Sequence, residues 1–326
     1  MQQVNHTPDE LKAALAGGLI PAMPVMFDRE GRFHQRAHER YVTFMSSQPI
    51  AGAAIWAHTG RGLLLEYDTA RIVMQQWRQA LPSKPLIAGV GARSNDSNPR
   101  QATSATLAMG SAAAEYGADA LLVYPPFWLK HHEHRDSLIV EHHKHLAELG
   151  LPLVLFYLYE AAGGVCYTTA VLDELLALPN VIGIKMATLD SVMTYQDVAR
   201  HIQSRQPDKL LITGEDRFLG YSLRRGAQTA LIGMGAVCTD LQAELMAAHF
   251  SGRSERFLEL SDMVDQLAEV LFIHPMEGYI GRILFALSKT GVIPVEAAND
   301  PWGPKLSSRQ LESITKVLNI LNVQVG

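Results

Sequence analysis

The sequence has little cysteine, no strongly basic segment and no long apolar run, and each of these absences excludes a class of protein. Its 326 residues include only two cysteines, Cys166 and Cys238, which are too few for a disulfide scaffold and fit a reducing compartment. The formal net charge of −5 and the lack of a basic stripe argue against nucleic acid as a partner. No apolar run approaches the roughly 20 residues that a membrane-spanning helix needs. Because the first residues also lack the basic and apolar regions of a signal peptide, we expect a cytoplasmic protein without a membrane partner.

What the sequence does contain is apolar material in short, regularly spaced runs. Hydrophobic residues make up 48% of the chain and charged residues 19%, which is enough to bury a large core. The runs cover residues 19–26, 50–57, 85–90, 118–124, 152–157, 181–186, 209–213 and 229–234. Continuous apolar strands separated by helical segments are typical of a parallel sheet covered on its outer face. Eight such units predict an α/β protein with a closed (β/α)8 TIM barrel.

The segments between and after these runs have helical spacing. Residues 102–116 form an alanine-rich stretch that ends at Gly117, and residues 168–178 form a stretch that Thr168 or Thr169 can cap. After the eighth run, residues 241–250, 255–272, 279–289 and 308–321 all indicate helices. We therefore divide the chain into an N-terminal segment (1–17), a barrel (18–240) and a C-terminal helical extension packed on the barrel (241–326).

In barrels of this kind the reacting groups lie at the carboxyl ends of the strands, which draws attention to Lys185 at the end of the sixth run. If Ile182 and Ile184 face the helices, strand alternation points Lys185 into the barrel. Burial would then lower the pKa of its amine, and a neutral amine attacks carbonyl groups to form an imine. The alternative is a lysine just beyond the strand that extends into solvent.

Two further positions qualify by the same rule. Tyr157 ends the fifth run, one strand–helix unit before Lys185, so we expect the two side chains on adjacent strands at the same height. A phenol there could carry protons to and from an imine, or it could simply fill core volume. After the second run, the loop from His58 to Gly62 has two glycines and backbone N–H groups able to hold a carboxylate, although an ordinary turn has the same composition.

Seven stretches resemble, in the right order, segments of the dihydrodipicolinate synthase and N-acetylneuraminate lyase family of class I, Schiff-base-forming aldolase barrels. The likeness runs from about Gly18 to Leu321. The stretches are Leu19–Arg32, Ala57–Arg61, Pro85–Gly91, Tyr116–Phe127, Asn180–Lys185, Thr213–Asp216 and Asn299–Glu312.

The resemblance implies a role for each matched position. Lys185 would form the imine with pyruvate or a related 2-oxo acid, and Tyr157 would transfer the proton. Thr59, Gly60 and the backbone of their loop would hold the carboxylate of the 2-oxo acid. Leu231 falls where the family places an apolar residue whose backbone carbonyl lies near the lysine. The family also implies no metal and no organic cofactor, and a homo-oligomer, either a dimer or a tetramer.

Four positions depart from the pattern of the synthases. His58 replaces the first hydroxyl residue of the family's Thr-Thr pair, and Arg61 replaces the glutamate that follows the glycine. Phe127 lies where the synthases carry a relay tyrosine and, by the resemblance, would border the substrate. Ala162 lies where they carry an arginine for the second substrate. We therefore expect retained imine chemistry with a different partner substrate. His58 either replaces the missing hydroxyl as an acid–base group, since its ordinary pKa is near 6.5, or only shapes the pocket or a subunit contact.

Three functions follow as hypotheses. The first is a lyase that acts on a 2-oxo acid, by aldol cleavage or addition or by dehydration of a 2-oxo-3-deoxy sugar acid. The second is a catalytically altered barrel that only binds a 2-oxo acid or a sugar acid. The third is a metal-dependent aldolase that uses the histidines at positions 131, 132, 134, 142, 143 and 145, although a solvated polar face is the simpler interpretation of that cluster.

Overall fold

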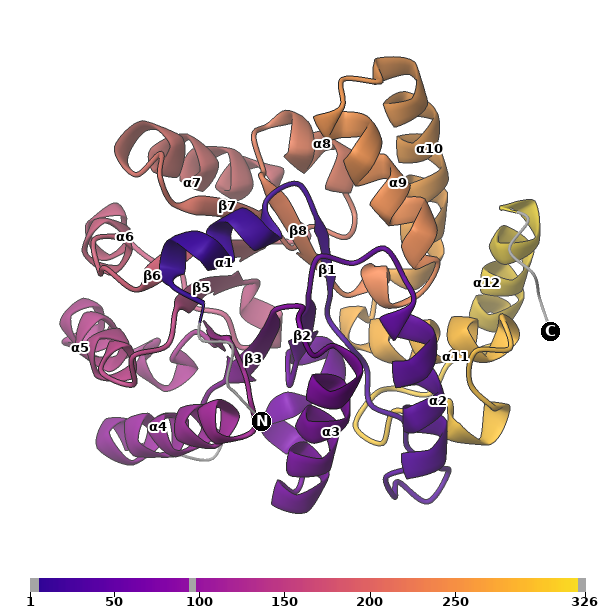
Figure 1. Cartoon of the computed structure of the whole chain (residues 1–326), viewed down its shortest axis with the longest axis horizontal. Helices are drawn as coiled ribbons and strands as arrows, with labels where there is room; N and C mark the ends of the chain where they lie inside the picture. The colour runs from indigo at the N-terminus through magenta and orange to yellow at the C-terminus, as the bar shows by residue number, and fades with distance from the viewer. Residues whose placement is uncertain (1–5, 94–97, 322–326) are drawn as a thin grey trace.

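The computed structural model describes residues 6–93 and 98–321, and at its centre lies a cylinder of parallel strands (Figure 1). The strands are β1 (Leu19–Pro21), β2 (Ala53–Ile55), β3 (Leu86–Val90), β4 (Ala120–Val123), β5 (Leu153–Leu158), β6 (Val181–Ala187), β7 (Leu210–Thr213) and β8 (Thr229–Ile232). They form one eight-stranded sheet in the order β1-β8-β7-β6-β5-β4-β3-β2. A parallel bridge between Ala22 and Ala54 joins β1 to β2 and completes the ring. The predicted (β/α)8 barrel is confirmed.

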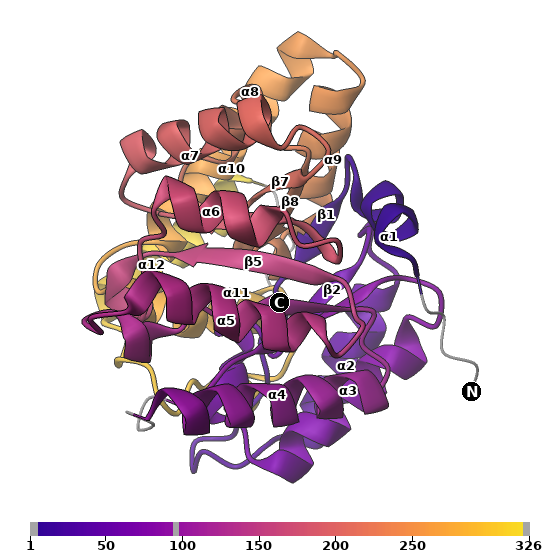
Figure 2. The ribbon, with the colours of Figure 1, turned by 90° about the vertical axis from the view of Figure 1, so that its left-hand side faces the viewer.

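Helices surround the cylinder and extend it on one side (Figures 1 and 2). The helices up to β8 are α1 (Pro8–Leu15), α2 (Gln35–Ser46), α3 (Tyr67–Ala80), α4 (Pro99–Glu115), α5 (Arg135–Ala147), α6 (Thr169–Leu176), α7 (Val192–Arg205) and α8 (Leu219–Arg224). Those that follow are α9 (Thr239–Phe250), α10 (Ser254–Leu271), α11 (Tyr279–Lys289) and α12 (Ser308–Ile320). The short 3-10 helices are η1 (His58–Gly60), η2 (Gly62–Leu64), η3 (Phe127–Leu129), η4 (Glu160–Ala162), η5 (Met234–Ala236), η6 (Met276–Gly278) and η7 (Val295–Ala297).

Local sequence signals explain where several of these helices begin and end. Of the two threonines that could cap α6, Thr168 is the cap, because its side chain accepts a hydrogen bond from the Val171 N–H. Gly117 follows the end of α4 with a φ of +94°, a left-handed conformation that favours glycine. The helix α12 begins with a capping box between Ser307 and Gln310.

The orientation predicted for β6 is right for Ile184 and Lys185 but wrong for Ile182. Ile184 packs in the outer core between barrel and helices, whereas Ile182 packs in the barrel interior with Leu11 and Leu15 of α1. The reason is an extra residue in β6, since Leu153 pairs with Val181 and the next residue of β5 pairs with Gly183. Such a bulge shifts the alternation of side chains, so both Ile182 and Lys185 face inward.

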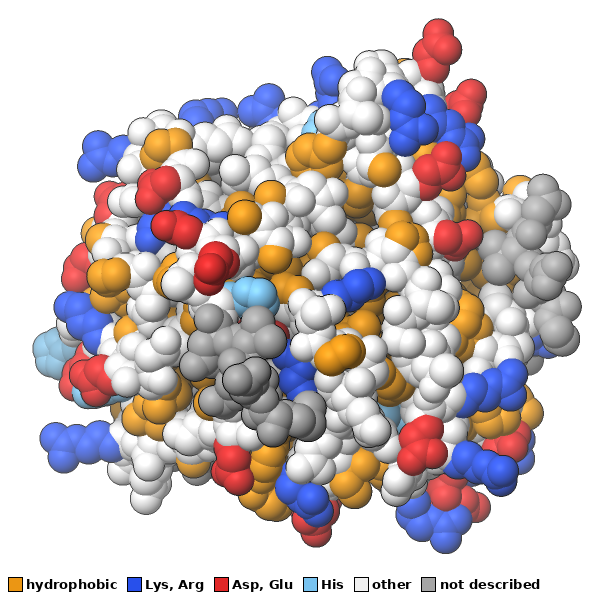
Figure 3. Space-filling model, viewed as in Figure 1, with side chains coloured by type: hydrophobic (Ala, Val, Ile, Leu, Met, Phe, Trp, Pro, Cys, Tyr) orange, Lys and Arg blue, Asp and Glu red, His pale blue; other side chains and the backbone are white. Residues whose placement is uncertain are grey.

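The distribution of charge on the surface and the lengths of the helices agree with what the composition of the sequence indicated. On the face drawn in Figure 3, Lys and Arg side chains are interspersed with Asp and Glu, without an extended region of one sign. No single helix among the described residues is long and apolar enough to cross a membrane, and one pair, Ser254–Leu271 with Met276–Lys289, passes that test only as a combination bent by 105°.

Candidate active site

Lys185 lies inside the carboxyl end of the barrel. Its side chain is only 5% exposed, and its Nζ lies 4.3 Å from the centre of the Phe156 ring on the neighbouring strand. Burial lowers the pKa of Lys185 to about 8, against the opposing charges of Asp216 and Glu215. A Cβ on residue 214 would lie 2.7 Å from the Lys185 Cε, so Gly214 leaves the room that the lysine side chain occupies. The amine is therefore buried and inward-facing, and a larger fraction of it is neutral at physiological pH than for an exposed lysine.

Two buried carboxyl groups, Glu215 and Asp216, follow β7, and both act electrostatically on this amine. Glu215 accepts hydrogen bonds from the Thr188 N–H at 2.7 Å and the Leu189 N–H at 2.8 Å, which fixes the turn that follows β6. Asp216 accepts one from the Met234 N–H at 2.7 Å, and it has the larger electrostatic effect on the pKa of Lys185. Burial raises the pKa of Asp216 to about 7, opposed by that hydrogen bond and by Lys185. Of the two, Asp216 is the better placed to exchange a proton with chemistry at the lysine.

The loop after β2 has the tight shape that its glycines indicate. A Cβ on Gly62 would overlap the carbonyl oxygen of Trp56, so only glycine fits there. The N–H groups of Gly60, Arg61 and Gly62 all donate to carbonyl groups within the loop. Within residues 6–93 and 98–321, by contrast, the N–H groups of His58 and Thr59 have no partner. Two adjacent unpaired N–H groups form the kind of concavity that binds a carboxylate.

Side chains from the C-terminal extension contact this loop, and the sequence did not predict these contacts. The hydroxyl of Tyr279, the first residue of α11, lies 3.0 Å from both the Thr59 Oγ1 and the His58 Nδ1. The His58 and Tyr279 rings are stacked with their centroids 5.9 Å apart. Burial lowers the pKa of His58 to about 4, with a smaller opposite effect from Glu277. His58 is therefore neutral at physiological pH.

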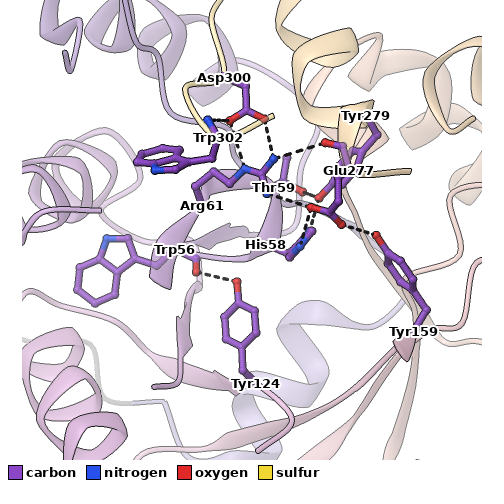
Figure 4. A network of polar contacts seen from close by, with 10 residues as sticks. All are labelled: Trp56, His58, Thr59, Arg61, Tyr124, Tyr159, Glu277, Tyr279, Asp300 and Trp302. Atoms are coloured by element: carbon purple, nitrogen blue, oxygen red, sulfur yellow. Dashed lines mark hydrogen bonds and ion pairs between the residues drawn. The ribbon is translucent and has the colours of Figure 1, made fainter. Parts of the chain in front are cut away.

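Arg61 connects the same loop to two acidic residues of the extension (Figure 4). Its Nη2 lies 2.7 Å from the Asp300 Oδ2, and its Nη1 lies 3.0 Å from the Glu277 Oε2. The Tyr159 hydroxyl donates to the other Glu277 oxygen at 2.8 Å. The clearest signal for this network in the sequence is Arg61 itself, a cation where the family has an anion. Glu277 belongs to none of the matched stretches, and Asp300 lies in the stretch Asn299–Glu312 without any indication there that it pairs with Arg61.

The arginine network predicts a large effect on stability. In Arg61→Ala, the side chain of Asp300, only 4% exposed, loses its cation, so we expect the free energy of unfolding to fall by about 3–5 kcal/mol. Urea unfolding measures this loss. The matched control is Arg256→Ala, because Arg256 and its partner Glu244 are 39% and 43% exposed and such a pair contributes only about 0–1 kcal/mol. Equal losses in the two variants would contradict the burial argument.

Tyr157 lies on the strand adjacent to that of Lys185, as predicted, but the predicted equal height is wrong by one residue. In the observed register Phe156 pairs with Lys185 and Tyr157 pairs with Met186. Because side chains alternate along β5, Phe156 faces the barrel interior, and Tyr157 packs in the outer core against Tyr167, with ring centroids 5.9 Å apart. The strand continues one residue further than the apolar run indicated, and Tyr159, beyond its end, is the tyrosine that reaches the mouth of the barrel.

The other predicted site residues lie around the same mouth. Leu231 is fully buried in the barrel interior on β8, and Gly60 lies in η1 with its backbone against Met23. Phe127 lines a cavity of about 290 Å3 at the mouth, together with His58 and Arg61. The predicted lysine, loop and Phe127 thus lie at one end of the barrel, and the tyrosine of this segment that contacts the Arg61 network there is Tyr159.

The histidine cluster after β4 is only partly the solvated face that its composition suggested, because His131, His132 and His134 are exposed whereas two histidines of α5 are not. His142 and His143 are buried. The His142 Nδ1 shares a hydrogen bond with the Thr103 Oγ1, and the His143 Nδ1 donates one to the Ile139 carbonyl. Burial lowers the pKa of His143 to about 4, so it packs as a neutral ring. In the described part of the chain, no group of three or more His, Cys, Asp or Glu side chains is arranged to hold a metal ion.

Comparison with known proteins agrees with this geometry. The sequence profile described as the Dihydrodipicolinate synthetase family matches residues 15–320. The 4-hydroxy-tetrahydrodipicolinate synthase of Bartonella tribocorum is 24% identical over 278 residues, which are 84% of this chain and 88% of that protein. The dihydrodipicolinate synthase structure from Thermotoga maritima superposes with a TM-score of 0.81 at 22% identity, covering 94% of this chain and 98% of that one. The N-acetylneuraminate lyase structure from Mycoplasma synoviae gives a TM-score of 0.74 at 20% identity, covering 94% and 98%.

The barrel and its relatives define an enzyme of the lyase class, aldolase in type. The chain belongs to the dihydrodipicolinate synthase family. The family resemblance predicted from the sequence is confirmed.

Proposed function

We propose that this protein is a class I lyase that joins a 2-oxo acid to Lys185 as an imine. The observation that carries the proposal is the buried, inward-facing amine of Lys185, whose pKa burial lowers to about 8. A lysine in that state is a nucleophile for ketones near neutral pH. Membership of a family that contains named synthases and lyases supports the same chemistry.

The proposed reaction uses the Lys185 amine and the groups that surround it. The amine attacks C2 of the 2-oxo acid, and the ketone oxygen leaves as water. The protonated imine then accepts the electron pair of a C3–H bond, or of the bond from C3 to C4, and becomes an enamine. The N–H groups of His58 and Thr59 would hold the substrate carboxylate. Tyr159 would transfer protons at the mouth, and Asp216 would accept one near the amine. When the C3–C4 bond breaks, C4 leaves as an aldehyde and its hydroxyl proton passes to a base. Protonation of the enamine at C3 then re-forms the imine, and water hydrolyses it, which releases the 2-oxo acid and restores Lys185. No step requires a cofactor.

Reductive trapping tests the proposal directly. Incubation with pyruvate and cyanoborohydride should add one reduced pyruvate irreversibly to the peptide that contains Lys185, as measured by peptide mass spectrometry. The internal control is Lys289, which also lies over an aromatic ring, with its Nζ 5.7 Å from the Phe285 centroid, but outside the barrel mouth. Absence of an adduct on Lys185 across pyruvate and several other 2-oxo acids would refute the proposal.

The initial rate of reductive trapping should rise with pH up to the pKa of Lys185. Only the neutral amine attacks the ketone, so the initial trapping rate should rise about tenfold per pH unit below the pKa of Lys185, which is about 8, and level off above it. An exposed lysine, whose pKa is about 10.4, would still show a rising rate at pH 9. Initial rates between pH 6 and 9.5 distinguish the two cases, with a continued rise to the upper limit contradicting the burial of the amine.

A second candidate is a barrel that binds a 2-oxo acid without turning it over. The salt bridges of Arg61 to Glu277 and Asp300 at the mouth favour it. Arg61 is a cation at the position where, by the family resemblance, the synthases carry a glutamate. Exchange of the pyruvate methyl protons with D2O separates the candidates, since exchange requires an enamine and simple binding does not. A metal-dependent reaction would instead be lost on treatment with EDTA.

A further inference from the structure

The cavity at the barrel mouth has a mainly apolar wall. It lies between η2, η3 and η4, and its apolar lining is supplied by Leu63, Leu64, Pro125, Phe127, Trp128 and Ala162. The Phe127 and Trp128 rings meet edge to face with their centroids 5.5 Å apart. Together these residues form a surface that matches a flat hydrocarbon group.

The polar side chains that line the cavity already have partners within the protein. The guanidinium of Arg61 donates to Asp300 and Glu277, and the Tyr124 hydroxyl donates to the Trp56 carbonyl at 3.3 Å. The His58 Nδ1 contacts the Tyr279 hydroxyl at 3.0 Å, and the His58 Nε2 lies 3.6 Å from the Glu277 Oε2. The indole N–H of Trp128 is unpaired, but it is buried and has no accessible surface toward the cavity. A substituent with several hydroxyl groups would therefore lose its hydrogen bonds to water on entering and find few replacements.

The cavity is close to the reactive amine. The Tyr124 ring, which lines the cavity, packs on the Phe156 ring with their centroids 5.6 Å apart. The Nζ of Lys185 lies over that same Phe156 ring at 4.3 Å. His58 also lines the cavity, and the charge of Lys185 contributes to lowering its pKa. To reach the cavity, the C3 and C4 atoms of a 2-oxo acid bound to Lys185 would extend past the Phe156 and Tyr124 rings.

We infer that the partner substrate is a small aldehyde with a flat, apolar substituent of about one ring, rather than a sugar-like polyol or a carboxylate-bearing aldehyde. This inference rests on the proposed function. The cavity volume of about 290 Å3 is at the lower end of the roughly 300–1,000 Å3 of small-molecule sites. In the addition direction, the enamine carbon of pyruvate forms a bond to the aldehyde carbon and the aldehyde oxygen takes up a proton. Water then hydrolyses the imine and releases a 4-hydroxy-2-oxo acid. Cleavage reverses these steps.

The test compares two aldehydes with pyruvate at saturation, namely benzaldehyde and glyceraldehyde, with the products quantified by mass spectrometry. We expect kcat/KM for benzaldehyde to exceed that for glyceraldehyde at least tenfold. In Leu63→Asn, and independently in Ala162→Asn from the opposite wall, the ratio of the two values should fall at least fivefold. The matched control is Leu258→Asn, a leucine that is 63% exposed on α10 and distant from the cavity, in which the ratio should not change.

Different results would contradict this inference and the proposed function. If wild-type protein gives no pyruvate adduct on Lys185, the proposed function is wrong. If the adduct forms but glyceraldehyde reacts as well as benzaldehyde, or if both wall variants keep the wild-type ratio, the inference of an apolar partner is overturned. Two variants from different loops are used because one of them could fail to fold.

Discussion

Replacing Lys185 by methionine is expected to abolish exchange of the pyruvate methyl protons with D2O, by a factor on the order of 10⁴ or more. Without the amine no imine forms, so no enamine can lose or regain a proton, and removal of the nucleophile leaves only substrate binding. The rate is read from the decay of the methyl signal in proton NMR spectra. The lost group is the one whose Nζ lies over Phe156 inside the barrel.

The same variant should fold normally, which makes the loss interpretable. Methionine has a similar length and is apolar, and it replaces a side chain that is only 5% exposed. The variant loses the electrostatic interaction of the amine with Asp216, but it also removes the cost of burying the amine, and the buried Asp216 can take up a proton once the cation is gone. We therefore expect the thermal midpoint to stay close to that of the wild type. Lys289→Met, the second lysine that lies over an aromatic ring, is the matched control and should exchange at the wild-type rate. Residual exchange in Lys185→Met would assign the chemistry to another group.

The parts of the fold that follow from local pattern were predictable from sequence. Eight apolar runs gave eight strands because a strand buried on both faces must be apolar along its whole length. The carboxyl-end rule then pointed to Lys185 and to the loop of His58 and Thr59. The orientation of Ile182 was not predictable, because the bulge that turns it inward depends on its pairing with β5, a contact between distant residues.

The parts of the candidate site that depend on tertiary contacts were missed. Glu277, Tyr279 and Asp300 come from the C-terminal extension, more than 200 residues from the loop that they contact. No spacing rule connects segments so far apart. His142 and His143 were misjudged for a related reason, since histidines on a helix become core residues only when a neighbouring element covers them. Tyr157 was chosen by its distance along the chain, whereas the strand register decides which tyrosine reaches the mouth.

The pairing register of β5 with β6 predicts a second large effect, in which substitutions of Tyr157 and Tyr159, only two residues apart, change the exchange rate very differently. In Tyr159→Phe we expect the exchange of pyruvate protons to fall about 10²–10⁴-fold, the range for loss of a positioned acid–base group. In Tyr157→Phe the rate should stay within about threefold of wild type, because that side chain packs against Tyr167 in the outer core. Burial raises the pKa of Tyr159, so its hydroxyl stays protonated at neutral pH and can donate a proton.

Loss of the Tyr159 hydroxyl also removes its hydrogen bond to Glu277, so a purely structural effect has to be separated from proton transfer. Trapping of pyruvate on Lys185 by cyanoborohydride provides that separation, because it reports imine formation and not the later proton transfer from C3. We expect Tyr159→Phe to keep the wild-type extent of trapping while exchange is slow. If trapping and exchange fall together, Tyr159 only positions the loop, and if Tyr157→Phe is the slower variant, the proton follows a route on the outer side of β5 instead.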